Sequence, residues 1–120
     1  MAALYVFLGG GLGSLCRYGV LLVFADHDLR LPAATITTNV LAGLILGLII
    51  GWAMRHTDNQ HIMLLGVVGF CGGFSTFSTF SLENVQLWQN GSIGPMLFNI
   101  ILSVIACFGS VWLGLKIMGQ

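Results

Sequence analysis

The chain is poor in charged residues, which make up 7% of its 120 positions, whereas apolar residues make up 57%. Soluble domains carry about 25% charged residues, so this chain could not cover a water-facing surface. Its four basic and four acidic residues balance, which argues against a nucleic-acid or acidic-substrate partner. We therefore expect a single domain, residues 1–120, that is solvated by lipid.

Cysteine and catalytic residue sets are also scarce. The three cysteines, Cys16, Cys71 and Cys107, are odd in number and lack CxxC spacing, so neither a disulfide framework nor a zinc site is indicated. We expect them to be small buried hydrophobes. No nucleophile–base set or metal-ligand cluster stands out, so the chain is not expected to be an enzyme.

What the chain does have is long apolar runs. A membrane-crossing helix needs about 20 mostly apolar residues, and four segments meet that length. Proline is tolerated where a helix begins, and Pro32 and Pro95 each lie at the expected start of a run. We predict an all-α membrane protein with spans at residues 4–24, 32–54, 62–88 and 95–116, joined by short polar loops at 26–31, 55–61 and 89–94.

The loops give little indication of orientation. An even number of spans places both termini on one side, together with Arg55 and Lys116, and leaves Arg30 alone on the other side. This is a weak bias under the positive-inside rule. We therefore hypothesise dual topology, in which copies insert in both orientations; tags that reported one fixed orientation would refute it.

The third span has an unusual centre, which reads GFCGGFSTFSTFS from Gly69 to Ser81. Paired glycines weaken a helix, and hydroxyl side chains compete for backbone hydrogen bonds. Inside a bilayer an irregular backbone survives only where protein or water covers it. The sequence thus predicts a helix broken in its middle and buried in an assembly. Its phenylalanines recur at helical spacing, which predicts one stripe of Phe70, Phe74, Phe77 and Phe80.

Polar side chains also occur within the other spans. Asn39 opens a series at four-residue spacing with Gly43, Gly47 and Gly51, a small-residue face suited to close helix approach. In the fourth span a polar stripe is formed by Asn99, Ser103, Cys107 and Ser110. From the residues alone, Asn39 and this stripe fit pore lining and interhelical hydrogen bonding equally well. The glycine-rich run 9–13 follows no strand and lacks a P-loop lysine, so we interpret it as a helix-packing surface.

Two charged residues lie within spans. Arg17 and Glu83 are at comparable depth, and their spans end on the same side. We hypothesise that they form an ion pair or share a water-filled vestibule. The alternative is that Arg17 extends alone to the lipid headgroups.

The third-span run from Gly69 to Ser81, with Glu83 shortly after it, closely resembles the signature of the Fluc/CrcB fluoride channels. The glycine-rich first span ending in Arg17-Tyr18, and Thr38-Asn39 followed by glycines, are similar to that family too. The resemblance covers the whole chain in length and span order. It implies an antiparallel homodimer in the bacterial inner membrane that exports fluoride passively and so relieves fluoride toxicity.

The resemblance also implies roles for individual residues. A central structural Na⁺ would be held by backbone carbonyls that match Gly72 and Ser75. Asn39, Phe77 and Phe80 match residues that line the fluoride pore, and Thr79 matches a hydroxyl of the polar wall. The fourth span departs from the family pattern, because Asn99 stands where many members have tyrosine and Cys107 replaces a common hydroxyl; with Ser103, Asn99 is still expected to line the pore.

The chemistry of these residues suits a small anion. Fluoride is tightly hydrated, so a selective path must replace its water with close hydrogen-bond donors, and phenyl ring edges carry partial positive charge. The main alternative is a small proton-coupled multidrug transporter. It would need a membrane-embedded carboxylate, but the first span has none and Glu83 lies near a span end. A membrane scaffold without transport activity would not need a broken, hydroxyl-rich span.

Overall fold

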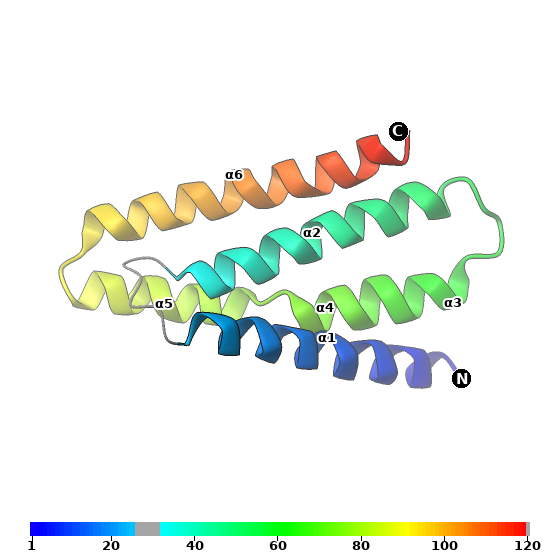
Figure 1. Cartoon of the computed structure of the whole chain (residues 1–120), viewed down its shortest axis with the longest axis horizontal. Coiled ribbons are helices and arrows are strands. Elements are labelled where there is room, and N and C mark those ends of the chain that lie inside the picture. The colour runs from blue at the N-terminus through cyan, green and yellow to red at the C-terminus, as the bar shows by residue number, and fades with distance from the viewer. Residues whose placement is uncertain (26–31, 120) are drawn as a thin grey trace.

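The computed structural model describes residues 1–25 and 32–119, so the predicted first loop at 26–31 lies outside the described residues. All regular elements within the described ranges are helical (Figure 1). In chain order they are α1 (Ala2–Phe24), α2 (Ala33–Ala53), α3 (Gln60–Ile62), the π-helix η1 (Met63–Cys71), α4 (Gly72–Phe74), α5 (Phe77–Gln89) and α6 (Ile93–Ile117).

Within the described residues, four units are long and apolar enough to cross a membrane, as many as the sequence predicts. They are α1, α2, the bent unit Gln60–Gln89 and α6. Pro32 directly precedes α2 and Pro95 lies in the first turn of α6, where the backbone N–H groups have no partner within the helix to lose. The chain is therefore a multi-pass membrane protein by helix length and composition.

The helices run lengthwise along the bundle. α6 packs along α2, and α1 packs along η1 and α4, while α2 also contacts η1. Both termini lie at the same end of the molecule, as four spans require (Figure 1). The bundle is 51 Å in its longest dimension, which exceeds the hydrocarbon thickness of a bilayer, about 30 Å.

Glycines allow close contacts of α1 with η1 and of α2 with α6. A Cβ atom added to Gly9 or Gly13 would meet backbone atoms of η1, and one added to Gly47 would meet the backbone of α6. Gly43 and Gly51 face α6 as well. Close approach of this kind increases van der Waals contact, which drives helix association in lipid. The predictions of packing surfaces at 9–13 and along α2 are confirmed.

The third span changes conformation near its centre. It begins with the short α3, continues as the π-helix η1 and then α4, and has extended backbone at Ser75 (ψ 157°) and Thr76 (φ −150°, ψ 113°) before α5 starts. The paired glycines are themselves helical, and Gly73 packs against the backbone of Gly10. The residues that leave the helix are therefore the hydroxyl-bearing ones that follow the glycines.

The predicted single stripe of phenylalanines is wrong. Phe74 is buried, whereas the side chain of Phe77 is 78% exposed. Two extended residues lengthen the chain without the 100° rotation of a helical residue, so α5 starts in a different rotational phase. The rings instead form two pairs, Phe70 with Phe74 and Phe77 with Phe80, with centroids 5.5 and 5.7 Å apart.

Candidate functional site

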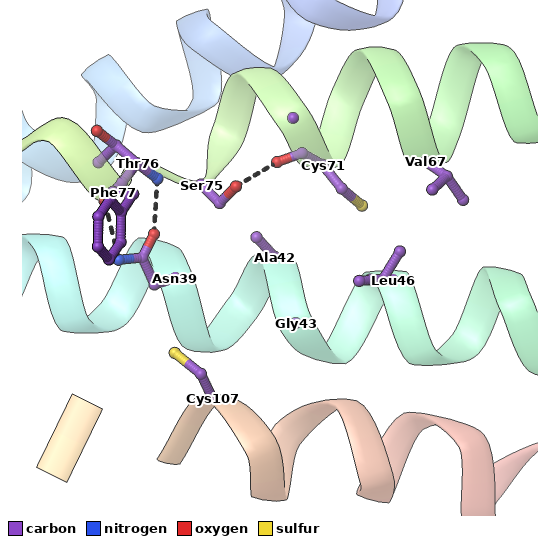
Figure 2. Close-up of a pocket in the computed structure, with 11 residues that line it drawn as sticks. Asn39, Ala42, Gly43, Leu46, Val67, Cys71, Ser75, Thr76, Phe77 and Cys107 are labelled. Atoms are coloured by element: carbon purple, nitrogen blue, oxygen red, sulfur yellow. Dashed lines mark hydrogen bonds between the residues drawn. The ribbon is translucent and has the colours of Figure 1, made fainter. Parts of the chain in front are cut away.

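The site is organised around a bond between Asn39 on α2 and the extended Thr76. The Thr76 N–H donates to Asn39 Oδ1 at 2.7 Å, and Asn39 Nδ2 donates to the Thr76 carbonyl at 3.2 Å (Figure 2). The backbone N–H and carbonyl of Thr76, a residue outside the helices, are thus both satisfied by one side-chain amide. Since unpaired backbone groups are costly inside a membrane, Asn39 stabilises the extended step.

Hydroxyl side chains complete the two helix ends that meet at this step. Ser75 Oγ donates to the Cys71 carbonyl at 2.8 Å, and Thr76 Oγ1 accepts from the Thr79 N–H at 3.2 Å as the N-cap of α5. Threonine is a favourable N-cap because its oxygen satisfies an otherwise unpaired N–H. The local sequence therefore ends one helix and starts the next.

These bonds change the environment of two backbone carbonyls, those of Gly72 and Ser75. In an α-helix each carbonyl accepts from the N–H four residues later. Here the N–H groups in question, on Thr76 and Thr79, donate to side chains instead. Ser75 O also accepts a long hydrogen bond, 3.5 Å, from Arg17 Nη1. Gly72 and Ser75 both lie along a groove of about 460 Å³.

That groove is bordered by α2, the third span and α6. Asn39 extends from α2 to the Thr76 peptide, and Cys107 on α6 points toward the same space (Figure 2). A second cavity of about 200 Å³ shares Asn39, Phe77 and Cys107 with the first. Its other lining residues are Phe80, Ser103, Val104 and Phe108. Four residues predicted to line a pore, Asn39, Phe77, Phe80 and Ser103, therefore border one cavity.

A third cavity, which Thr76 also lines, is markedly more polar than the other two. Its volume is about 330 Å³. Thr79 lines this cavity and not the one that Phe77 and Phe80 line. The remaining lining residues are Arg17, Leu21, Thr35, Thr38, Thr76 and Ser78.

Arg17 and Glu83 take different partners. The Arg17 guanidinium donates to the Ser75 carbonyl. Glu83 Oε1 accepts from Thr35 Oγ1 at 2.6 Å, and its Oε2 is buried without a hydrogen-bond partner. Arg17 lines the polar cavity, and so does Thr35, the partner of Glu83. Arg17 thus lines the polar cavity directly, and Glu83 is connected to it through Thr35. The two charged residues make no direct bond with each other.

Asn99 does not line the cavity of Phe77 and Phe80 but lies in the contact between α5 and α6. Its side chain is fully buried, and its Nδ2 donates to Asn84 Oδ1 at 3.0 Å. Ser103 Oγ donates to Asn99 Oδ1 at 3.5 Å, and Asn84 Nδ2 donates to the Phe80 carbonyl at 2.7 Å. The polar stripe of α6 therefore makes interhelical hydrogen bonds at Asn99, while Ser103 also reaches the cavity.

Asn84 is the residue that the sequence analysis missed. It is an amide within an apolar span, and its side chain is only 6% exposed. Buried amides in spans are usually functional or bond neighbouring helices. Asn84 could have been predicted on the same ground as Asn39, since both are amides within an apolar span.

The cavity that Phe77 and Phe80 line offers hydrogen-bond donors and aromatic ring edges. None of its lining residues carries a formal positive charge. Phe77 and Phe80 both line this cavity, with their rings tilted at 39° to one another. Ring edges carry partial positive charge. Such a lining can replace the water around a small anion and bind it weakly enough to release it.

Comparison with known proteins identifies a family for the chain. Residues 4–115 match the family model described as CrcB-like protein, Camphor Resistance (CrcB). A protein of Saccharophagus degradans named fluoride-specific ion channel FluC is 37% identical, with 96% of this chain and 90% of that one covered. Proteins of the same name from Azobacteroides pseudotrichonymphae and Salmonella arizonae are 36% and 39% identical, covering 89% and 88% of this chain and 87% and 84% of theirs.

These relatives are named as ion channels and not as enzymes, in agreement with the expectation from the sequence. The extended third-span step, the Asn39 amide and the paired phenylalanines lie within the matched residues. Fold, site and comparisons lead to one assignment: the chain belongs to the CrcB family of membrane proteins.

Proposed function

We propose that this chain is a fluoride-selective channel that lets F⁻ leave the bacterial cytoplasm passively across the inner membrane and so relieves fluoride toxicity. The observation that carries the proposal is the cavity where Asn39, Phe77, Phe80 and Ser103 meet. The names of the relatives support the choice of ion.

The cavity suits fluoride because it combines one amide, one hydroxyl and two ring edges. Fluoride is smaller than chloride and gains more from short hydrogen bonds. An arginine or lysine in the path would bind it too tightly for conduction, which requires release. Arg17 lies in the separate polar cavity together with Thr79, where it would raise the local anion concentration at an entrance.

We further propose that two copies assemble in opposite orientations. The ring of Phe77 and that of Phe108 in the same cavity are 78% and 77% exposed. A single copy thus leaves one side of the path open, and lipid chains would offer fluoride no hydrogen bonds there. A second copy would cover it, and the weak charge bias of the loops permits both orientations.

A structural Na⁺ at the centre of this assembly is also part of the proposal. The carbonyls of Gly72 and Ser75 lose their usual helical donors, and both residues line one groove. Oxygen ligands of this kind suit a hard cation, and carbonyls at helix breaks bind Na⁺ in other membrane proteins. Two carbonyls cannot enclose an ion, so the second copy would supply the others.

Fluoride efflux from liposomes tests the function. Purified protein is reconstituted in vesicles loaded with potassium fluoride or potassium chloride, and valinomycin is added while an ion-selective electrode records the released anion. We expect rapid fluoride release and no chloride release, without a proton gradient. Proton movement driven by a cationic drug, with no fluoride release, would instead favour the small multidrug transporter.

A further inference from the structure

A chain of side-chain hydrogen bonds crosses from α5 to α6 and ends at the cavity. Ser103 Oγ donates to Asn99, Asn99 donates to Asn84, and Asn84 donates to the Phe80 carbonyl. The three bonds measure 3.5, 3.0 and 2.7 Å. Asn99 is 0% and Asn84 6% exposed, so water does not compete for these amides.

The direction of donation along this chain is fixed at the Phe80 end. A carbonyl oxygen can only accept, so Asn84 must turn its N–H group toward Phe80 and its Oδ1 toward Asn99. Asn99 must then turn its N–H group toward Asn84 and its Oδ1 toward Ser103. Ser103 therefore faces an acceptor, and its one hydroxyl hydrogen is directed away from the cavity.

This orientation matters for an anion, which needs that hydrogen. The bond from Ser103 to Asn99 is the longest of the three, 3.5 Å, and lies beyond the usual range of O–H···O hydrogen bonds, about 2.5 to 3.0 Å. Rotation of the hydroxyl would turn its O–H group away from Asn99 and let it donate to an anion beside Phe77 and Phe80. Because the competing bond is long and weak, this rotation costs little, while the Asn99 oxygen still offers the hydroxyl an acceptor when the anion leaves.

We propose that Asn84 is a positioning residue for anion passage. Acting through Asn99, it holds the Ser103 hydroxyl hydrogen away from the cavity until an anion accepts it, and so keeps anion binding weak enough for release. This inference rests on the proposed fluoride conduction. It assigns a role to a residue that does not itself line the cavity.

The test compares the fluoride dependence of efflux in single and double variants. In Asn84→Leu, no acceptor dictates the orientation of the Asn99 amide, so its N–H group can donate to Ser103 and leave the hydroxyl hydrogen pointing into the cavity. We expect the half-saturating fluoride concentration to fall about twofold, the low end of the range for one hydrogen bond, because the competing bond is long. The maximal rate should fall as well, because release becomes slower.

Ser103→Ala provides the decisive background. Without the hydroxyl, Asn84→Leu should leave the half-saturating concentration unchanged, since only a shared pathway produces such non-additivity. Gln86→Leu is the matched control, because it makes the same change on the exposed face of α5. It should alter neither parameter. Asn99→Leu, which removes the acceptor of Ser103 directly, should repeat the effect of Asn84→Leu.

Several outcomes would overturn the inference alone. One is fluoride efflux in Asn84→Leu with an unchanged or raised half-saturating concentration. Another is the same decrease in the Ser103→Ala background. A third is the failure of both Asn84→Leu and Asn99→Leu to fold. The hydrogen bonds would then serve to hold α5 against α6, and the inference would be overturned. Absence of fluoride efflux from the unaltered protein would instead overturn the proposed function.

Discussion

Replacing Asn39 by aspartate separates two roles of this residue, stabilising the extended step and lining the anion path. The aspartate can still accept from the Thr76 N–H, but it cannot donate to the Thr76 carbonyl, which Asn39 does at 3.2 Å. Leaving a buried carbonyl unpaired costs about 1–3 kcal/mol of folding free energy. We therefore expect a moderate decrease in the melting temperature of Asn39→Asp.

The effect on conduction should be much larger. A carboxylate and an anion about 4 Å apart repel by about 4 kcal/mol at an effective dielectric constant of about 20. Since about 1.4 kcal/mol corresponds to a factor of ten, anion occupancy beside residue 39 should fall about a thousandfold. Fluoride efflux from liposomes measures this loss, normalised to the amount of folded protein.

Asn59→Asp supplies the matched control for the lost donor. Asn59 Nδ2 donates to the Ala53 and His56 carbonyls, both at 2.8 Å, in the turn that follows α2. This turn is remote in sequence from the extended step and contributes no residue to the cavity of Phe77 and Phe80. We expect Asn59→Asp to lower the melting temperature while fluoride efflux stays normal. Efflux from Asn39→Asp that matched the unaltered protein would refute the placement of Asn39 in the path.

Other perturbations test the packing, the rings and the cation. Gly13→Ala should lower the melting temperature by an amount equivalent to about 1–3 kcal/mol, because a Cβ would meet backbone atoms of Phe70 and Phe74; Gly11→Ala, with open space around it, should not. Phe77→Ala should reduce fluoride efflux at least tenfold. Phe7 on α1 is similarly exposed but lies outside the cavities that Phe77 lines, so Phe7→Ala should leave efflux unchanged. Equal rates for the two variants would contradict a role for the Phe77 ring. Exchanging Na⁺ for N-methylglucamine in detergent solution should lower the melting temperature, since ligand binding to the folded state stabilises it; an unchanged value would contradict a structural Na⁺.

The spans and their glycine faces could be predicted because both depend on local properties of the sequence. Transfer of an apolar run into lipid is a sum over its residues, and a glycine at four-residue spacing marks a close contact regardless of its partner. The glycines at 43, 47 and 51 therefore pointed to the α2 face that α6 covers.

The rotational relation between segments could not be predicted in this way. Ser75 and Thr76 leave the helix, and this shifts the phase of every residue after them. Phe77 consequently becomes exposed although helical spacing assigned it to the same stripe as the buried Phe74. Hydroxyl runs are compatible with both helical and extended backbone, so the length of the step was not readable from the sequence.

Pairings between helices were the least accessible part of the site. Asn84 and Asn99 become partners only because α5 and α6 present these faces to one another. The hypothesis that Arg17 and Glu83 form an ion pair or share a vestibule relied on comparable depth and on spans that end on the same side. Depth does not fix the direction of a side chain, and Glu83 bonds Thr35 while Arg17 bonds Ser75.

The most direct test of fluoride conduction is the reversal potential of current through the purified protein in a planar bilayer. With unequal fluoride concentrations on the two sides, we predict reversal at the Nernst potential for F⁻, unmoved when a chloride gradient or a pH gradient is added. A reversal potential that followed the pH gradient or the chloride gradient would contradict a passive, fluoride-selective path past Asn39 and Phe77.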